Sequence, residues 1–587
     1  MKIFDEIEKY INDASKKIGV DENFSVTFSN MPKLCDVQCN GCFAAAKKYG
    51  KNPFQLATEI VENIDQNEDF IFEVAKPAFI NVKITDAKFS KIANEFVNDE
   101  MGGVEKHKDK KFVILDYGGA NIAKALHIGH LRAPIIGESL KRLYRLLGDK
   151  VLGDVHLGDW GLQMGLTELQ LYYDGVLDYY FKKKGKEPTI TLDMLNVAYP
   201  KASARKNVDE DFKKQADEWT IHIQQKVEPY YTIYKKIKEV SVSQIKKHYH
   251  ELGVDFDLWY GESDADPYID KALKIIEEKG LTYISDGALV VDVANEDENI
   301  PIKKENDEDV QRYKNPMPPA ILKKYNGGVL YVTTDIATIL MRNTELGVAD
   351  RIEYVVDGRQ AMHFKQVFRV CKKSGISPEK QELIHIGFGT INGKDGKPFK
   401  TRDGETIKLE DIINMLINKA SEKLIANGTE VTRDTALKIG VAALKFGDLS
   451  NTVEKDYIFD LERFMAFEGK TGPYLQYTVV RINSILNKVE ENFGEFVVND
   501  EEEREIIRAI LRLNSVYDIC YRDKSLVSLC NSAYVLASSF STFYNNHKVI
   551  SEPDLKKKAS YLTLLKLVRN KLMQALNVIG IDVPEKM

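Results

Sequence analysis

The spacing of apolar and polar residues divides the chain into three stretches of different periodicity. Residues 1 to about 105 begin with a helical pattern, and a second helix is predicted to open at Pro53, because proline fits the first turn of a helix. Two β-rich runs follow at 69–75 and 78–84, and an amphipathic helix is predicted over about 86–98. This first stretch is therefore predicted to be a small α+β domain.

The middle stretch, from about 106 to 460, alternates short apolar runs with helical patterns. Such an alternation with short connections is typical of a parallel, doubly wound sheet. A long, charged and mostly helical segment separates the first two strands from the others, and we interpret residues 186–328 as an insertion into an α/β domain. The predicted strands lie at 112–116, 151–156, 329–332, 352–356 and 383–389.

From about 461 to 587 the strand signal stops, and apolar residues recur at three-to-four spacing over several long segments. This periodicity predicts an all-α helical bundle. The fold predicted for the whole chain is an α/β core with a helical insertion, preceded by an N-terminal α+β domain and followed by the bundle.

Composition narrows the class of protein. A chain of 587 residues is too long to fold around one hydrophobic core, so several domains are expected. With 43% hydrophobic residues it is too apolar to be disordered. No run of about 18 apolar residues occurs, so no membrane-spanning helix is expected. The acidic start lacks a secretory signal and the six cysteines form no disulfide framework, so we expect a cytoplasmic protein. A net charge of −7 argues against a general polyanion-binding coat but permits a local basic face.

The most informative motif lies in residues 116–138, directly after a predicted strand. It contains Lys124, then His127 and His130 on either side of Gly129, and then a helix. A helix N-terminus offers free N–H groups, imidazoles can donate to phosphate oxygens, and glycine lets a flat base approach the backbone. Such groups can stabilise the transition state of an attack on the α-phosphate of a nucleotide. Two histidines at this spacing are otherwise surface residues or an adventitious metal pair, but their position after a strand favours the nucleotide site.

The same passage resembles the signature of class I aminoacyl-tRNA synthetases, and ANIAKALHIGHLR resembles its form in arginyl-tRNA synthetases. Similar stretches occur from end to end: HLGDWGLQMG (156–165), VLYVTTDIA (329–337), VVDGRQAMHFKQV (355–367), GKPFKTRDG (396–404) and FEGKTGPYLQYTVVRI (467–482). The resemblance implies three domains. They are an additional tRNA-binding domain (1–105), a Rossmann-like catalytic domain (106–460) and a DALR-type anticodon-binding bundle (461–587).

The resemblance also implies an activity. A ligase of this family joins L-arginine to tRNA(Arg) in two steps through arginyl-adenylate, and it converts ATP, bound with Mg²⁺, to AMP and pyrophosphate. Lys124, His127, Gly129 and His130 would then act on ATP. A monomer is expected.

Arginine carries a guanidinium, whose burial requires carboxylate partners. By the resemblance, Glu262, Tyr331 and Asp335 would face this group, with Tyr331 and Asp335 at the end of the 329–332 strand. From the residues alone, Glu262 could equally be an exposed acid, Tyr331 a strand-end aromatic and Asp335 a helix N-cap.

Three further residues would complete the arginine site by the same resemblance. Asn121 and Gln360 would hold the α-amino end of the amino acid, and Asp116 would belong to the same wall. Parallel sheets place ligands at the carboxyl ends of their strands, where Asp116 is predicted to lie.

The second signature of the class is altered in this chain. The loop that is normally Lys-Met-Ser-Lys-Ser corresponds to Lys400, Thr401 and Arg402, so that the second lysine is replaced by Thr401. The resemblance implies that Lys124 substitutes for it, and that activation of arginine is coupled to tRNA binding. Alternatively, Lys400 and Arg402 decorate a surface hairpin. The segment 118–120 also departs from the family, which usually has two serines and a proline where this chain has Gly-Gly-Ala.

Five residues are expected to contact tRNA. Phe79 and Asn81 match a family pair that holds a D-loop base, and an aromatic with an amide suits an unpaired nucleotide. Tyr474 and Tyr477, about one helical turn apart, and the C-terminal Met587 are expected near the anticodon loop by resemblance. Phe79 and the two tyrosines could instead be core residues.

The cysteines Cys35, Cys39 and Cys42 have the spacing of radical-SAM iron–sulfur sites. We reject that interpretation, because no strand repeat of a barrel follows and residues 36–50 are predicted to be helical. We expect no bound protein metal, although a three-cysteine zinc site with an unidentified fourth ligand is the alternative.

Three other functions compete with the arginine ligase. Another class I synthetase would differ in its amino acid, and a cysteinyl enzyme would need zinc ligands in the catalytic domain. A small nucleotidyltransferase shares the His-x-Gly-His motif but lacks the bundle and the N-terminal domain. A non-catalytic tRNA-binding paralogue would keep the fold, but retention of Lys124, His127, His130 and Asp335 favours an enzyme.

Overall fold

The computed structural model describes residues 2–182, 188–295, 301–302, 312–313, 317–325, 327–397, 407–489 and 493–587. The chain forms two compact units. The first unit comprises Met1–Lys106, Ala466–Val578 and Asp582–Met587, and the second comprises His107–Met465 and Ile579–Ile581. Among the described residues, no helix combines the length and the apolar character needed to cross a bilayer.

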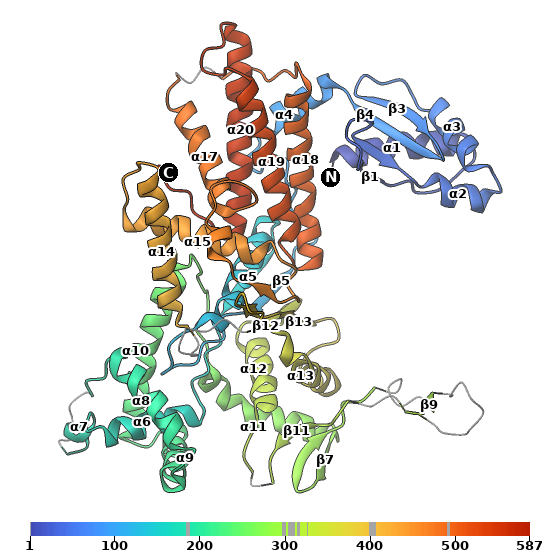
Figure 1. Cartoon of the computed structure of the whole chain (residues 1–587). Helices are drawn as coiled ribbons and strands as arrows, with labels where there is room; N and C mark the ends of the chain where they lie inside the picture. Colours follow the sequence, from blue (N-terminus) through green and yellow to red (C-terminus); the bar gives the residue numbers. More distant parts are fainter. Residues whose placement is uncertain are drawn as a thin grey trace. The chain divides into compact units, whose positions relative to one another are not determined.

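The second unit is built on a four-stranded parallel sheet in the order β13-β12-β5-β6 (Figure 1). Its strands are β5 (Phe112–Asp116), β6 (Lys150–Asp154), β12 (Arg351–Asp357) and β13 (Glu382–Phe388). In β5 the residues Val113, Ile114 and Leu115 are all fully buried, as expected for a parallel strand that is covered on both faces. The carboxyl ends of the strands meet at one edge, where ligands bind in sheets of this kind. The predicted parallel α/β core is confirmed.

Helices and short strands complete this core. A hydrophobic cluster joins Ile114 and Ile352 of the sheet to Ile336 of α12 and to Val367 of α13. The elements outside the insertion are η1 (Ile128–His130), α5 (Arg132–Leu146), α12 (Tyr331–Glu345), η3 (Gly358–Gln360), α13 (Ala361–Ser374), β14 (Ile391–Asn392), α14 (Leu409–Ala426), α15 (Arg433–Leu449), β15 (Tyr457–Ile458) and α16 (Leu461–Phe464).

The strand predicted at 329–332 is wrong. Val329 makes only an isolated bridge to Lys323, Leu330 is an extended N-cap, and α12 already begins at Tyr331. The buried residues of α12 recur at helical spacing. The apolar run at 329–332 is therefore the end of the preceding connection followed by the first residues of the helix. A short apolar run cannot by itself distinguish these two cases. Tyr331 and Asp335 therefore lie in the first turns of a helix, not at a strand end.

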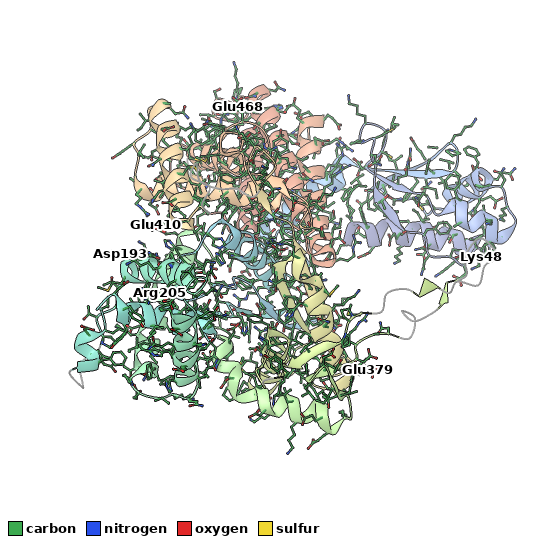
Figure 2. The ribbon with its side chains drawn as sticks, turned by 60° about the horizontal axis from the view of Figure 1, so that its bottom comes forward. Lys48, Asp193, Arg205, Glu379, Glu410 and Glu468 are labelled. Atoms are coloured by element: carbon green, nitrogen blue, oxygen red, sulfur yellow. The ribbon has the colours of Figure 1, made fainter. Side chains whose placement is uncertain are left out.

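The insertion is helical, as predicted, but it also contains a three-stranded antiparallel sheet, β11-β8-β7. Asp193 and Arg205 mark the first and last turns of α8, where their charges suit the helix dipole (Figure 2). Two helices of the core precede the insertion, α6 (Leu162–Tyr173) and α7 (Asp178–Lys182). The elements of the insertion are α8 (Leu192–Arg205), α9 (Glu210–Gln224), α10 (Tyr230–Glu251), α11 (Glu262–Glu278), β7 (Thr282–Ser285), β8 (Ala288–Val291), β9 (Pro301–Ile302), β10 (Arg312–Tyr313) and β11 (Ala320–Lys323).

The first unit contains a four-stranded antiparallel sheet, β1-β2-β4-β3, with four helices. The α3 helix begins at Pro53 and α4 spans Asp86–Asn98, as predicted. The helix predicted over 36–50 is partly wrong, because Val37 and Cys39 are buried on one face of a strand that pairs with β4. The elements are α1 (Lys2–Lys17), β1 (Val26–Phe28), β2 (Val37–Cys39), α2 (Cys42–Tyr49), α3 (Pro53–Glu62), β3 (Phe70–Ala75), β4 (Phe79–Ile84) and α4 (Asp86–Asn98).

The same unit contains the C-terminal helices, and α18, α19 and α20 lie side by side in it (Figure 1). These helices bury apolar residues at the predicted spacing, for example Ile506 and Ile510 on α18. The predicted all-α bundle is confirmed. Its helices are α17 (Gly472–Leu486), α18 (Glu501–Asp523), α19 (Val527–Asn546) and α20 (Leu555–Ile579).

Candidate active site

The histidine motif forms a tight turn at the start of η1. The backbone N–H of His127 donates to Nδ1 of His130 at 3.1 Å, and the N–H of Gly129 donates to Nδ1 of His127 at 3.1 Å. Because each Nδ1 accepts a hydrogen bond, each imidazole carries its proton on Nε2. The two ring centroids lie 4.0 Å apart. The turn therefore holds two Nε2–H donors next to each other.

Both imidazoles are neutral at physiological pH. Burial, with a smaller contribution from the positive charge of Lys124, lowers the pKa of His127 to about 4 and that of His130 to about 3. Lys124 itself is exposed on the loop that precedes the motif. A permanent ammonium and two neutral donors on one loop can bind phosphate oxygens without a proton change.

The second signature loop precedes a segment that pairs with the histidine motif. The predicted residues Lys400, Thr401 and Arg402 lie outside the described residues. The chain that follows them is fixed, because Ile128 N–H donates to Ile407 O at 3.1 Å and Leu409 N–H donates to Leu126 O at 2.9 Å. From Ile407 onward the chain is therefore tied to the backbone of the histidine motif.

Glu262 is the first residue of α11, and the loop after β6 holds it there. The buried Asp159 accepts a hydrogen bond from the backbone N–H of Ser263 at 2.9 Å, and Trp160 N–H donates to Glu262 Oε2 at 3.4 Å. A Cβ atom at Gly261 would meet the Asp159 carboxylate at 2.6 Å, so glycine is needed for this approach. Glu262 is thus a fixed carboxylate on an end of a helix, not a free surface acid.

The electrostatics of Glu262 connect it to the other predicted arginine ligands. Burial raises its pKa from 4.5 to about 6, His156 opposes the rise, and the charges of Asp159 and Asp335 add to it. Partial burial of the Tyr331 hydroxyl raises the pKa of Tyr331, and the negative charge of Glu262 adds to the rise. Asp335 forms a short contact with His363 Nε2, and Tyr331 is 72% exposed. The structure therefore brings Glu262, Asp335 and Tyr331 into one electrostatic neighbourhood.

Asn121 is also positioned at this edge of the sheet. Its backbone forms a bridge with Gly158, and Ile122 N–H donates to Gly158 O at 3.1 Å. A Cβ atom at Gly158 would lie 2.1 Å from Asn121 Oδ1, so the amide packs directly on that glycine. Gln360 is exposed at the end of η3, beyond β12. Among the described residues, Gln360 and Asn121 form no hydrogen bond with each other.

Asp116 already has a partner. Its Oδ2 accepts a hydrogen bond from Arg342 Nη2 at 2.6 Å, and the same nitrogen donates to Asp154 Oδ2 at 2.6 Å. All three side chains are buried. Burial raises the pKa of the Asp116 carboxyl, and the Arg342 guanidinium opposes that rise. Asp116 thus forms part of a buried ion network below the strand ends, with one oxygen engaged by Arg342.

Sequence reasoning missed several residues of this edge. Asp159 and His156 belong to the HLGDWG block, whose resemblance was noted without assigning roles to them. Asp154 ends the observed strand β6, a position typical of ligand-edge residues, but the predicted strand continued to 156. Arg342 is preceded by no local motif, and only its contacts reveal it.

Comparisons with known proteins bear on this geometry. Residues 91–461 match the family of class I tRNA synthetases (R), catalytic domain. Residues 3–84 match the arginyl tRNA synthetase N terminal domain, and residues 475–587 match the DALR anticodon binding domain. The arginine–tRNA ligase of Agathobacter rectalis is 40% identical over 614 residues and covers 100% of both chains. That of Alkaliphilus oremlandii is 42% identical over 603 residues, which is 99% of each.

The chain belongs to the arginyl-tRNA synthetase family.

Solved structures of this family share the fold. Arginyl-tRNA synthetase from Plasmodium falciparum superimposes with a TM-score of 0.79 at 24% identity, over 100% of this chain and 99% of that one. The Thermus thermophilus enzyme gives 0.78 at 20% identity over 100% of both chains.

Arginyl-tRNA synthetases charge tRNA(Arg) with arginine through an aminoacyl-adenylate intermediate, in an ATP-dependent reaction. Arginine, ATP and tRNA(Arg) are therefore the substrates of this chain, and the predicted ligase is confirmed. The family match also decides against another synthetase, a small nucleotidyltransferase and a non-catalytic paralogue.

The residues expected to contact tRNA lie in the first unit of this arginyl-tRNA synthetase. Phe79 is half-buried with its ring 5.5 Å from that of Phe43, and Asn81 accepts a hydrogen bond from Gln38 Nε2 at 2.8 Å. Their half-buried state leaves part of each side chain accessible. In α17, Tyr477 is 41% exposed.

Tyr474 differs from Tyr477, because its hydroxyl lies 2.9 Å from Ser541 Oγ and the side chain is half-buried. Tyr474 thus packs against α19 while Tyr477 points toward solvent. The C-terminal Met587 is half-buried.

The cysteines of this synthetase are all free and buried. Burial raises the pKa of Cys39 to about 11 and that of Cys42 to about 12, so both thiols stay protonated at neutral pH. Among the described residues, the one group of three His, Cys, Asp or Glu side chains close enough to share an ion is Asp116, Asp154 and His156, and Arg342 already donates to both of its carboxylates.

Proposed function

We propose that the histidine turn and Lys124 bind the phosphates of ATP during formation of arginyl-adenylate. The observation that carries this proposal is the pair of Nε2–H donors, which backbone hydrogen bonds fix in one tautomer. Donors that are already oriented stabilise the charge that develops on the α-phosphate without reorganisation. Gly129 leaves the backbone open to the adenine ring, and Mg²⁺ enters with ATP, bridging its phosphates.

Arginine binds with its guanidinium toward Glu262 and Asp335 in this proposal. An acid of raised pKa is an unsatisfied charge, and a guanidinium is the partner that would satisfy it. Tyr331, which is exposed on the first turn of α12, can cover the guanidinium from the solvent side. Asn121 and Gln360 take the α-amino end of arginine.

The reaction then proceeds in two steps. The carboxylate of arginine attacks the α-phosphate in line, a P–O bond to pyrophosphate breaks, and arginyl-adenylate forms. The terminal ribose hydroxyl of tRNA next attacks the activated carbonyl and releases AMP. Asp116 supports the wall of the arginine site through its ion pair with Arg342.

Lys400, Thr401 and Arg402 are proposed to neutralise the leaving pyrophosphate together with Lys124. The bonds of Ile407 and Leu409 to Ile128 and Leu126 support this role, because they tie the chain that follows that loop to the histidine motif. Since Thr401 carries no charge, we propose that arginine activation requires bound tRNA.

For tRNA, we propose contacts from Phe79 and Asn81 in the 1–105 domain, and from Tyr477, Tyr474 and Met587 in the 461–587 domain. Because Tyr477 is exposed, it is the better candidate of the two tyrosines for a contact with RNA. We further propose a monomer located in the cytoplasm, where free buried cysteines remain reduced. Sedimentation of the purified chain tests the monomer.

ATP–pyrophosphate exchange tests the site. With arginine and tRNA(Arg), the wild-type chain should exchange, and His127→Ala should lower kcat by about 10²–10³, the usual loss for one preorganised donor. The exposed His250→Ala is the matched control and should behave as wild type. Unchanged turnover in His127→Ala would refute the phosphate assignment, and full exchange without tRNA would refute the coupling.

A further inference from the structure

The loop that carries Lys124 is fastened to the insertion at two points on one helix. The hydroxyl of Tyr249 on α10 donates to Gly118 O at 2.6 Å. Two turns earlier on the same helix, Ser241 Oγ accepts the backbone N–H of Ala123 at 3.0 Å. Tyr249 and Ser241 are both buried. The insertion therefore reaches the loop before and after Asn121.

Both attachment points are at unusual backbone conformations. Gly118 has φ +103° and Ala123 has φ +62°. A left-handed conformation is unfavourable for alanine and persists only where the surroundings impose it. Lys124 follows Ala123 directly, so the direction in which its side chain leaves the loop depends on this conformation. The Ala123 N–H donates to the serine hydroxyl.

Packing alone does not hold this part of the loop. A pocket separates it from the insertion, lined by Ala123, Lys124 and Leu126 on the loop side and by Leu195, Gln244 and Ile245 on the helices. Ala123 and Ser241, which this hydrogen bond joins, both line that pocket. On the opposite side, Gly158 pairs with the loop backbone.

We propose that Ser241 and Tyr249 are positioning residues for arginine activation, and that they act through Lys124. The helix α10 of the insertion fixes the ends of the loop, and the loop then presents the Lys124 ammonium to the phosphates. This inference rests on the proposed role of Lys124 in ATP binding. It adds a function for the insertion, whose helix α10 becomes a part of the catalytic apparatus.

The test measures ATP–pyrophosphate exchange with arginine and tRNA(Arg) for Ser241→Ala. We expect kcat to fall about tenfold to a hundredfold, because small displacements of a reacting group have effects of that size. Ser241→Thr restores the hydroxyl, so it should recover most of the activity. Ser243→Ala, exposed on the same helix, is the matched control and should match wild type.

A double-mutant cycle separates positioning from general stability. If Ser241 acts through Lys124, adding Ser241→Ala to Lys124→Ala should cause no further loss of kcat. A purely structural role would lower kcat by the same factor in both backgrounds, and that result would overturn the inference. Tyr249→Phe removes only the hydroxyl bonded to Gly118 and provides the second variant, which should also lose its effect in the Lys124→Ala background.

The two proposals fail differently. If Lys124→Ala keeps the wild-type kcat, the proposed role of Lys124 is wrong, and the positioning inference falls with it. If Lys124→Ala is slow while Ser241→Ala and Tyr249→Phe both exchange at the wild-type rate, only the positioning inference is overturned. Thermal unfolding of each variant identifies a loss of fold, in which case the remaining variant decides.

Discussion

Replacement of Glu262 by glutamine tests the electrostatic account of arginine selection. The substitution keeps the shape of the side chain and its position at the start of α11, and removes only the charge. In the free protein, burial and the nearby acids raise the pKa of Glu262 from 4.5 to about 6. An ionised Glu262 therefore costs about 2 kcal/mol relative to water, at about 1.4 kcal/mol for each factor of ten.

The sign of the effect follows from this pKa. Because the folded-state pKa is above the unfolded value, the stability that Glu262 contributes is full below pH 4.5 and is lost as pH rises through about 6. Glu262→Gln should thus stabilise the free protein above pH 6 by up to about 2 kcal/mol and leave it unchanged at pH 4. When arginine is bound, the ionised Glu262 is favoured over glutamine, because the guanidinium of arginine supplies its counter-charge.

The assay is exchange of pyrophosphate at limiting arginine, measured between pH 5 and 8. For wild type, kcat/KM for arginine should fall with unit slope below about pH 6, since this ratio reports the pKa values of the free protein. Glu262→Gln should lower the plateau by about 10²-fold, the value of a charged hydrogen bond of about 3 kcal/mol, and should abolish the acid limb.

Glu277→Gln, an exposed acid in the last turn of α11, serves as the control and should keep both the plateau and the limb. An acid limb that persists unchanged in Glu262→Gln would refute the reasoning, because the titrating group would then lie elsewhere.

Three further predictions concern the free energy of unfolding. Arg342→Met leaves the buried Asp116 and Asp154 without their cation and should cost about 3–5 kcal/mol, seen as a lower urea midpoint; a wild-type midpoint would contradict the buried network. Gly118→Ser places a Cβ atom 2.7 Å from the Phe256 ring at φ +103°, so it should lower the free energy of unfolding by about 1–3 kcal/mol and slow ATP–pyrophosphate exchange. At Gly161 a Cβ atom would meet nothing within 4 Å, so Gly161→Ser should change neither the stability nor the exchange rate. Burial lowers the pKa of Lys571 to about 7, so the unfolded chain binds more protons than the folded chain between pH 7 and 10.5, and the free energy of unfolding rises over that window. Lys571→Met should remove this rise. If the variant unfolds with the same pH dependence as wild type, the assignment of the rise to Lys571 is wrong.

Local pattern predicted most of the elements. The parallel strands β5, β12 and β13 are short apolar runs because both of their faces are covered, and the amphipathic α4 has the predicted bounds, Asp86–Asn98. The run at 329–332 failed because four apolar residues suit the entry to a buried helix as well as a strand. The strands of the insertion sheet, β7, β8 and β11, were not predicted, because they are short runs within charged sequence.

The histidine motif, the altered second signature and the family were determined by the sequence, because these residues are close together along the chain. The tautomer and charge of His127 and His130 required the turn itself, since backbone N–H groups choose the protonated nitrogen. The pairing of Asp116 and Asp154 with Arg342 spans 226 and 188 positions. Likewise Ser241 meets Ala123 from 118 positions away. Periodicity records which face of an element is buried; only the order of the strands and the packing of the insertion decide which distant side chains share that buried space.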